Sequence, residues 1–129
     1  MDKNDINMEE LNKMVSKGAI LLDVRSPQEY REGHLKGAIS IPEYELANRC
    51  SKELKNKDQE IIVYCSSGSR SKKAQKQLQR KGYINVYNLY NGIQNYWDFK
   101  INMLELGTGQ KHFIIYQSKS RDMSKYNKI

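Results

Sequence analysis

The residues best suited to chemistry lie in one short stretch, Cys65 to Arg70. Its sequence is CSSGSR, with a thiol at the front, an arginine at the back and only small residues between them. Small residues let a loop turn its backbone N–H groups toward one point, and a following helix adds unpaired N–H groups and the positive end of its dipole. Such a loop binds an anion. The anion expected here is the thiolate of Cys65, or a group attached to it.

A strand and a helix are expected to position this loop. Residues 61–64 form an apolar, β-branched run that is typical of a buried strand. After the loop, Ala74 and Leu78 lie four residues apart among lysines and arginines, which predicts an amphipathic helix that Gly82 ends. A cysteine at the C-terminal end of a parallel strand lies where open α/β sheets place their ligands. A thiolate held there by N–H groups and a fixed positive charge is a nucleophile.

The rest of the chain alternates between strand and helix patterns. Further strands are expected at 19–24, 38–41 and 85–89, and Ile6 is either a short strand or a packing contact. Further helices are expected at 7–17, from Pro27 to Gly33, at 43–54 and from Ile93 to about Leu106. About five strands alternating with helices predict an α/β fold, in which a central parallel sheet carries helices on both faces.

Length and composition predict one soluble domain. The chain has 129 residues, of which 38% are hydrophobic and 29% charged. Its longest apolar run, 19–22, is too short to span a bilayer, so no membrane contact is expected. The first ten residues are polar and acidic, unlike an export signal, and a cytoplasmic location is therefore expected.

The cysteines and histidines do not predict a metal site. Cys50 and Cys65 are too few for a disulfide framework, and both are expected to be free thiols. His34 and His112 are far apart in the sequence, and no cluster has the spacing of metal ligands. We expect neither a metal nor another cofactor.

The net charge of +7 favours anionic partners, although a solvated, lysine-rich surface is the simpler explanation. Charge alone is weak evidence for a nucleic-acid partner, which we consider a minor alternative. The stretch 107–129 is polar and basic apart from an apolar run at 112–117. That run is compatible with an edge strand, a packed arm or a dimer contact, and disorder is expected after it.

Four segments together resemble one known family. The loop CSSGSR, followed by serine, resembles the active-site loop of single-domain rhodanese-family sulfurtransferases, which carry Cys-x-x-Gly-x-Arg. The strand IIVYC resembles the approach to that loop, and VYNLYNGIQNYW resembles the family's closing segment, although Asn91 replaces its usual first glycine. Because Asn tolerates positive φ, we expect the turn to be preserved. The segment LLDVRSPQEYREGHLKGAISIP resembles the family's first signature, with these residues in place: Asp23, Arg25, Glu29, Tyr30, Gly33, His34, Gly37, Ala38 and Pro42.

The resemblance covers about residues 5–106 and implies a rhodanese-like domain at 1–106, a three-layer fold followed by a basic extension at 107–129. It also implies an enzyme of double-displacement type. The Cys65 thiolate attacks a sulfane sulfur donor such as thiosulfate and forms a persulfide, from which a thiol, cyanide or a protein acceptor takes the sulfur. Arg70 would attract the anionic donor and stabilise the persulfide. The loop N–H groups that would hold the persulfide belong to Ser66, Ser67, Gly68, Ser69, Arg70 and Ser71.

The length of the loop discriminates between two chemistries of this fold. Phosphatases and arsenate reductases that resemble it have five residues between Cys and Arg, whereas four lie between Cys65 and Arg70. Ser71 occupies the phosphatase position and cannot clamp phosphate oxygens as an arginine does. A smaller ring suits a single sulfur atom, so phosphatase activity is disfavoured.

Other candidate residues have simpler structural interpretations. Asp23 and Arg25 are expected to tie the loop after the first core strand to its neighbours by hydrogen bonds. His34 is more simply a structural histidine than a proton shuttle. Cys50 is more simply a packed helix residue than a resolving thiol for Cys65.

Two functional hypotheses of different class therefore remain. The leading one is a thiosulfate or persulfide sulfurtransferase. The alternative is a rhodanese-fold binding, regulatory or sulfur-carrier module with little turnover, in which the extension mediates a partner contact or a homodimer. The retained cysteine favours the enzyme, and the basic extension favours the module.

Overall fold

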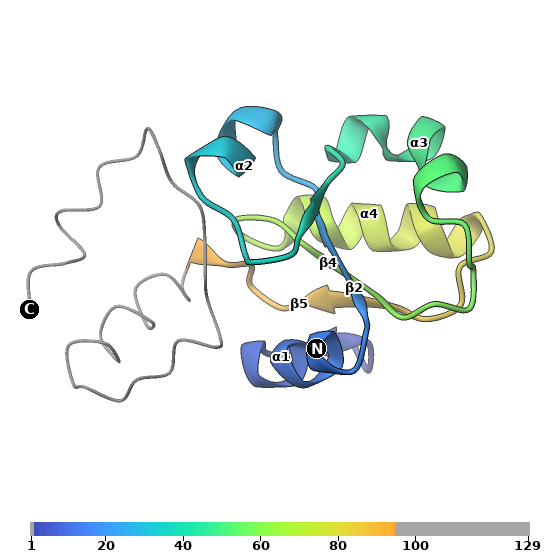
Figure 1. The fold of residues 1–129 in the computed structure, drawn as a ribbon, viewed down its shortest axis with the longest axis horizontal. Coiled ribbons are helices and arrows are strands. Elements are labelled where there is room, and N and C mark those ends of the chain that lie inside the picture. Colours follow the sequence, from blue (N-terminus) through green and yellow to red (C-terminus); the bar gives the residue numbers. More distant parts are fainter. Residues whose placement is uncertain (1, 95–129) are drawn as a thin grey trace, which may run out of the picture.

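The computed structural model describes residues 2–94, which form a five-stranded parallel sheet with helices on both faces (Figure 1). The strands follow the order β1-β5-β4-β2-β3, which confirms the predicted fold class. Their bounds are β1 Asp5–Ile6, β2 Ile20–Asp23, β3 Ile39–Ser40, β4 Ile61–Tyr64 and β5 Val86–Leu89. The helices are α1 Met8–Ser16, α2 Pro27–Glu32, α3 Leu46–Glu53 and α4 Ser69–Arg80, with a 3₁₀ turn η1 at Glu43–Glu45.

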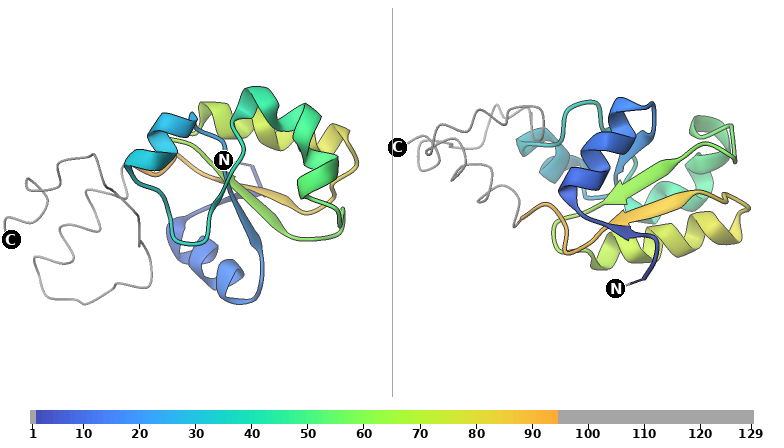
Figure 2. Two further views of the ribbon diagram at one scale, coloured as in Figure 1. Left: turned by 45° about the horizontal axis from the view of Figure 1, so that its top comes forward. Right: turned by 90° about the horizontal axis from the view of Figure 1, so that it is seen from below.

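Strand β4 is the central strand of the sheet, and its side chains alternate between two cores. Ile61 and Val63 pack in one buried cluster with residues of α3 and α4. Ile62 and Tyr64 pack in the other, together with residues of α1. Figure 2 shows α1 on one side of the sheet and α3 and α4 on the other. Because β4 is covered on both faces, its C-terminal end is held rigidly where the Cys65 loop begins.

Two helices begin where the sequence predicts. The Asn7 side chain accepts the Glu10 N–H at 2.8 Å, and the Glu10 carboxylate accepts the Asn7 N–H at 2.9 Å, which forms a capping box at the start of α1. The same reciprocal pair joins Ser26 and Glu29 at the start of α2, where Pro27 is the first helical residue. Both caps are local, so they could be predicted from residue spacing alone.

The structure differs from the sequence prediction at two helix starts. The segment 43–54 begins as the 3₁₀ turn η1, after Pro42, and becomes α-helical only at Leu46. Helix α4 begins at Ser69, so Ser69 and Arg70 belong to its first turn and not to the preceding loop. The early start is possible because Gly68 adopts a left-handed conformation, φ +105°, that turns the chain directly into the helix.

Several predictions fall on residues outside 2–94. These are the end of the last helix near Leu106, the boundary between residues 106 and 107, the strand at 112–117 and the disorder after it. Within residues 2–94, no helix is long and apolar enough to cross a membrane. The same residues contain no group of three or more His, Cys, Asp or Glu side chains that could hold a metal ion.

Candidate active site

The thiol of Cys65 lies at the C-terminal end of β4, enclosed by the loop that follows. Its Sγ accepts the backbone N–H of Gly68 at 3.1 Å and that of Ser71 at 3.3 Å. The Ser71 hydroxyl is 3.4 Å from the same sulfur. Cys65 and Ser71 are both fully buried. The loop and the first turn of α4 thus direct two N–H donors to one sulfur atom, which is the anion-binding arrangement that the small residues predicted.

The turn after β5 supports this loop from the side. Ile93 N–H donates to the Cys65 carbonyl at 3.0 Å, and Gln94 N–H donates to the Ser66 carbonyl at 3.1 Å. The backbone approaches so closely that a Cβ atom on Gly92 would lie 2.1 Å from the Ser66 carbonyl oxygen. Asn91 has φ +66°, which confirms that asparagine keeps the turn in place of glycine.

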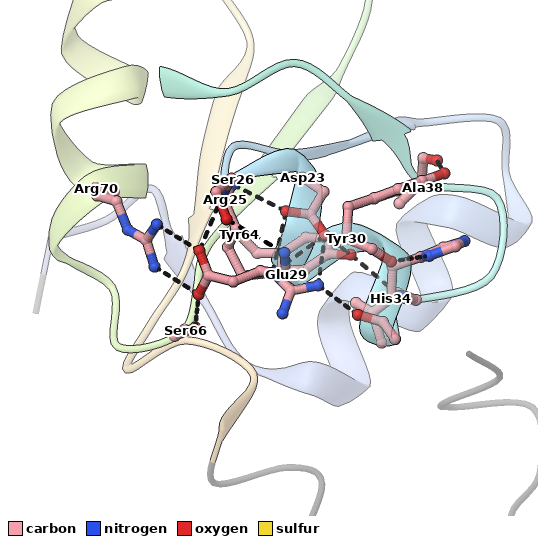
Figure 3. A network of polar contacts seen from close by, with 12 residues as sticks. Asp23, Arg25, Ser26, Glu29, Tyr30, His34, Ala38, Tyr64, Ser66 and Arg70 are labelled. Carbon is pink, nitrogen blue, oxygen red and sulfur yellow. Dashed lines mark hydrogen bonds and ion pairs between the residues drawn. The ribbon is translucent and has the colours of Figure 1, made fainter. Parts of the chain in front are cut away.

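An ion pair closes the outer side of the loop (Figure 3). Arg70 donates two hydrogen bonds to the Glu29 carboxylate, at 2.7 Å and 3.0 Å. The Ser66 hydroxyl donates to the same carboxylate at 3.1 Å, and so does the Ser26 N–H at 3.0 Å. Glu29 therefore caps α2 and fixes the Cys65 loop at the same time. Hydrogen bonding from Arg70, supported by Ser26, lowers the pKa of Glu29 to about 2 despite partial burial.

This contact changes the interpretation of two residues. From sequence, Glu29 had a role only in the first turn of a helix and in the family signature. The structure brings it to the loop, and no local pattern indicates this because Glu29 and Arg70 are 41 positions apart in the sequence. The guanidinium of Arg70, expected to serve the sulfur donor, here binds a carboxylate. A direct role of Arg70 in donor binding stays a prediction.

The expected hydrogen bonds of Asp23 and Arg25 are present, and they lie deeper in the fold. Arg25 donates to the Asp23 carboxylate at 2.7 Å and to the Gly33 carbonyl at 2.6 Å. The Tyr64 hydroxyl donates to Asp23 at 2.8 Å and accepts the Leu35 N–H at 3.1 Å. Burial, followed by the charge of Asp23, raises the pKa of Tyr64 well above its usual value. This buried network joins β2, β4 and the segment after α2, and thereby places Glu29 beside the loop (Figure 3).

The other predicted residues have separate environments. His34 stacks on Tyr30 with ring centroids 3.7 Å apart, and its Nδ1 is 2.8 Å from the Tyr30 carbonyl oxygen, as suits a structural histidine. Cys50 is a buried free thiol on α3, and its Sγ lies 3.9 Å from the Ala47 carbonyl oxygen. Ser67 in the loop and Ser69 in the first turn of α4 are both exposed.

Comparison with known proteins places this geometry in a family. The family profile described as Rhodanese-like domain matches residues 7–99. A sulfurtransferase of Allochromatium vinosum is 34% identical over 92 residues, which are 70% of this chain and 84% of the relative. The solved structure of a rhodanese-related protein from Thermoplasma volcanium has a TM-score of 0.62 at 32% identity, covering 72% of this chain and 89% of that one.

A longer relative matches almost the whole chain. A tRNA uridine(34) hydroxylase of Buchnera aphidicola is 31% identical over 132 residues, and the match covers 97% of this chain. This chain spans only 40% of the length of that relative. The profile match, the sulfurtransferase relative and the enclosed cysteine after the central strand agree: the chain belongs to the rhodanese-like domain family.

Proposed function

We propose that this protein is a sulfurtransferase that moves a sulfane sulfur from an anionic donor such as thiosulfate to a thiol, cyanide or a protein acceptor. The observation that carries the proposal is the Cys65 sulfur, which receives the N–H groups of Gly68 and Ser71 at the end of the central strand. The family membership and the sulfurtransferase relative support it. A cytoplasmic location stays a prediction.

The reaction has two displacement steps. The Cys65 thiolate attacks the outer sulfur of thiosulfate, the S–S bond breaks, and sulfite leaves with the bonding electrons. The enzyme then carries a persulfide on Cys65. An acceptor thiolate attacks the outer sulfur of this persulfide. The bond between that sulfur and the Cys65 sulfur then breaks, and Cys65 leaves as the thiolate. In the second step the leaving group is the Cys65 thiolate, whose developing charge the N–H groups of Gly68 and Ser71 stabilise.

The size of the loop favours sulfur as the cargo over phosphate. Ser71 occupies the position at which the phosphatases of this fold carry arginine. Here its backbone N–H and its hydroxyl both contact the Cys65 sulfur directly. These contacts leave little space between Ser71 and the thiol, and a single added sulfur atom needs less room than a tetrahedral oxyanion.

The proposal is tested by incubating the full-length protein with thiosulfate and cyanide. Thiocyanate should form, and Cys65→Ser should abolish its formation. Mass spectrometry after thiosulfate treatment should show a gain of about 32 Da, one sulfur atom, on the peptide that contains Cys65. A wild-type protein that gives neither thiocyanate nor this adduct with any sulfane donor would overturn the proposal.

A second candidate is a role in RNA modification, favoured by the match to the tRNA uridine(34) hydroxylase over 97% of this chain. The net charge of +7 is compatible with an RNA partner. Binding of Cys65→Ser protein to bulk tRNA, measured at several salt concentrations, separates RNA recognition from turnover. Tight binding that weakens steeply with salt favours this role, and the absence of binding at low salt excludes it.

A further inference from the structure

Arg70 is the arginine of the Cys65 loop motif, and its guanidinium is already bound to a carboxylate (Figure 3). Both of its terminal nitrogens donate to Glu29, one to each oxygen, at 2.7 Å and 3.0 Å. The side chains of Arg70 and Glu29 are 39% and 32% exposed, so the pair is accessible to a charged molecule in solution. The pair has no net charge. The sulfur transfer proposed above gives no role to this neutralisation.

The pair is close enough to the reacting sulfur to act on an approaching donor. Hydrogen bonding to Glu29 is the largest contribution that raises the pKa of Arg70, and the charge of Cys65 raises it further. Ser66, the neighbour of Cys65, donates to the Glu29 carboxylate at 3.1 Å. Cys65 itself is fully buried, so a donor reaches its sulfur only when loop residues move. Glu29 binds the loop both at Ser66 and at Arg70, and the donor therefore meets the loop in the field of this pair.

Two other cations near the loop are neutralised as well. Arg25 is paired with Asp23 at 2.7 Å, and Lys72, two residues after Arg70, is paired with Asp5 at 3.0 Å. With these charges cancelled, the attraction for an anion comes from backbone N–H groups and from the positive end of the α4 dipole, which is equivalent to about half a unit charge. A whole unit charge gained or lost at the surface pair is large by comparison.

We propose that Glu29 determines which sulfur donors the site prefers. By neutralising Arg70 it removes the advantage of a doubly charged donor such as thiosulfate, so that donors carrying their sulfane sulfur with less charge compete with it. The inference rests on the proposed sulfur transfer. The electrostatic energy of a donor is proportional to its charge. A change of one unit charge at the pair should therefore change the binding free energy of a dianion twice as much as that of a monoanion.

Glu29→Gln removes the charge and keeps most of the local contacts. A capping box accepts Gln as well as Glu at its third helical position, so the hydrogen bond from the Ser26 N–H is retained. The amide oxygen also accepts one hydrogen bond from Arg70. Hydrogen bonding from Arg70 holds the pKa of Glu29 at about 2, so the wild-type carboxylate is ionised near neutral pH. The substitution therefore changes the charge of the pair by one full unit.

The proposal is tested with two donors that differ in charge, thiosulfate with two negative charges and methanethiosulfonate with one. The Cys65 thiolate attacks the outer sulfur of either donor and the S–S bond breaks. Sulfite or methanesulfinate leaves with the bonding electrons, and cyanide then takes the sulfur from the persulfide as thiocyanate. In a double-displacement reaction, kcat/KM for the donor reports only the steps up to the persulfide. The donor ratio is kcat/KM for thiosulfate divided by that for methanethiosulfonate.

At low salt, Glu29→Gln should raise kcat/KM about tenfold for thiosulfate and about threefold for methanethiosulfonate. The donor ratio should therefore rise about threefold, and comparing ratios between variants cancels the intrinsic reactivity of the two donors. A loss of loop support changes the rate with both donors equally and leaves the ratio unchanged. A donor ratio that stays at the wild-type value would overturn the proposal.

The ratio should follow the net charge of the pair in both directions. Arg70→Gln leaves Glu29 as an uncompensated negative charge, and the donor ratio should fall about threefold. The double variant Glu29→Gln/Arg70→Gln is neutral again and should return to a ratio close to that of the wild type. A double variant whose ratio is as low as that of Arg70→Gln would show that Glu29 has no influence on donor choice.

Glu53→Gln is the matched control. Glu53 is 32% exposed, like Glu29, and it accepts a hydrogen bond from Arg49 at 2.6 Å. Helix α3 ends at Glu53 and leads to the start of β4, whereas Cys65 follows the end of that strand. This variant gains the same charge and breaks a similar ion pair, and its donor ratio should match that of the wild type. An equal rise of the ratio in Glu53→Gln and Glu29→Gln would contradict a local effect.

Salt separates the charge of Glu29 from its structural role. The Debye length shrinks from about 30 Å at 0.01 M ionic strength to about 3 Å at 1 M. The higher donor ratio of Glu29→Gln should therefore fall toward the wild-type value as salt is added. A ratio that is raised equally at both ionic strengths would mean that the substitution reshapes the loop, and the proposal would be wrong.

Binding to an inactive protein separates this proposal from the sulfur transfer itself. Full-length ¹⁵N-labelled Cys65→Ser protein is titrated with each donor, and the Nε–H signal of Arg70 is followed by NMR. Adding Glu29→Gln should increase the affinity for thiosulfate about threefold more than that for methanethiosulfonate. If this difference appears but active protein forms no thiocyanate, the sulfurtransferase proposal fails alone. If thiocyanate forms and neither ratio changes, the role of Glu29 fails alone, and thermal unfolding confirms that each variant is folded.

Discussion

Two regions of this protein each place a cysteine in the same core, and the contacts of the two sulfur atoms differ. Cys50 on α3 and Cys65 after β4 are both buried and belong to one cluster between the sheet and the α3–α4 layer. The Cys65 sulfur receives two backbone N–H groups, whereas the Cys50 sulfur lies 3.9 Å from the Ala47 carbonyl oxygen and interacts with the Tyr83 side chain. Burial is shared, so it cannot be the feature that prepares a thiol for chemistry.

The difference arises from where each cysteine lies in its element. Inside a helix, every N–H is already committed to a carbonyl four residues earlier, so a side chain finds no free donor. At a junction from strand to helix, the N–H groups of the loop and of the first helical turn are unpaired. Cys65 lies at such a junction, and Cys50 lies within a helix. The following predictions test this contrast, from the largest expected effect to the smallest.

The largest effect should come from replacing each of the two cysteines in a separate variant. Cys65→Ser should lower thiocyanate formation by on the order of 10³-fold or more, because it removes the nucleophile. Cys50→Ala should leave the rate within about twofold and reduce the free energy of unfolding by about 1 kcal/mol through lost packing. Steady-state rates and urea denaturation measure both. A large rate loss in Cys50→Ala would mean that the two regions are not distinct in function.

The next effect should come from breaking the support of the Cys65 loop while leaving its sulfur in place. Gly92→Ala puts a Cβ 2.1 Å from the Ser66 carbonyl oxygen at a residue with φ +74°. The backbone must shift, so we expect a loss of about 2–4 kcal/mol in unfolding free energy and at least a tenfold loss in rate.

Gly18→Ala is the matched control for that change. Gly18 also has positive φ, +105°, but a Cβ there meets nothing within 4 Å. It should cost about 1 kcal/mol, the backbone strain alone, with no effect on the rate at a temperature where the variant is folded. Equal rates in the two variants would show that the turn after β5 does not position the loop.

A smaller effect should follow from removing the charge of Glu29. Glu29→Gln should reduce the free energy of unfolding at pH 7 by about 1–2 kcal/mol, because a partly exposed bidentate pair is worth more than an ordinary surface pair. The pKa of Glu29 is lowered from 4.5 to about 2, so its stabilising effect is complete above pH 4.5 and is lost as the pH falls through 2.

Urea denaturation of wild type and Glu29→Gln across this pH range checks the sign. The difference between them should be largest near neutral pH, should shrink below pH 4.5 and should approach zero only below pH 2. Glu53→Gln, which breaks an exposed i,i+4 pair with Arg49, is the control and should cost less than about 0.5 kcal/mol. A difference that grows toward acid pH would contradict the assignment.

The smallest effect should come from Ser71→Ala, which removes the hydroxyl near the Cys65 sulfur but keeps the backbone N–H. If the N–H donors distinguish the two cysteines, the rate should fall less than about tenfold and stability by about 1 kcal/mol. Ser69→Ala, at an exposed residue of the same turn, should change neither. A loss of rate close to that of Cys65→Ser would mean that the Ser71 hydroxyl, and not the N–H groups, distinguishes Cys65 from Cys50.

Much of this arrangement could be predicted from local sequence. The Asn7–Glu10 and Ser26–Glu29 caps involve residues three apart, and the strand 61–64 is apolar throughout. The order Cys, small residues, Arg indicated a loop that binds the thiol sulfur through its N–H groups. The start of α4 was misplaced because a left-handed Gly68 can begin a helix without a side-chain cap, which residue spacing does not reveal.

The contacts between residues that are far apart in the sequence could not be predicted. Glu29 reaches Arg70 over 41 positions, and Lys72 reaches Asp5 over 67. Each of these residues also has an ordinary local interpretation, as a capping carboxylate or a helix-surface charge. Only the strand order, which brings β1 beside β5 and β2 beside β4, selects between the interpretations.

The sequence by itself determined which cysteine begins the loop between strand and helix, and the α/β fold, because these depend on residue type, spacing and hydrophobic period over a few positions. The tertiary structure decided what supports the loop around the sulfur: the carboxylate that binds Arg70 and the turn that contacts Ser66. Hydrogen bonds and close packing act over a few ångströms. They therefore exist only after the sheet has brought distant segments together.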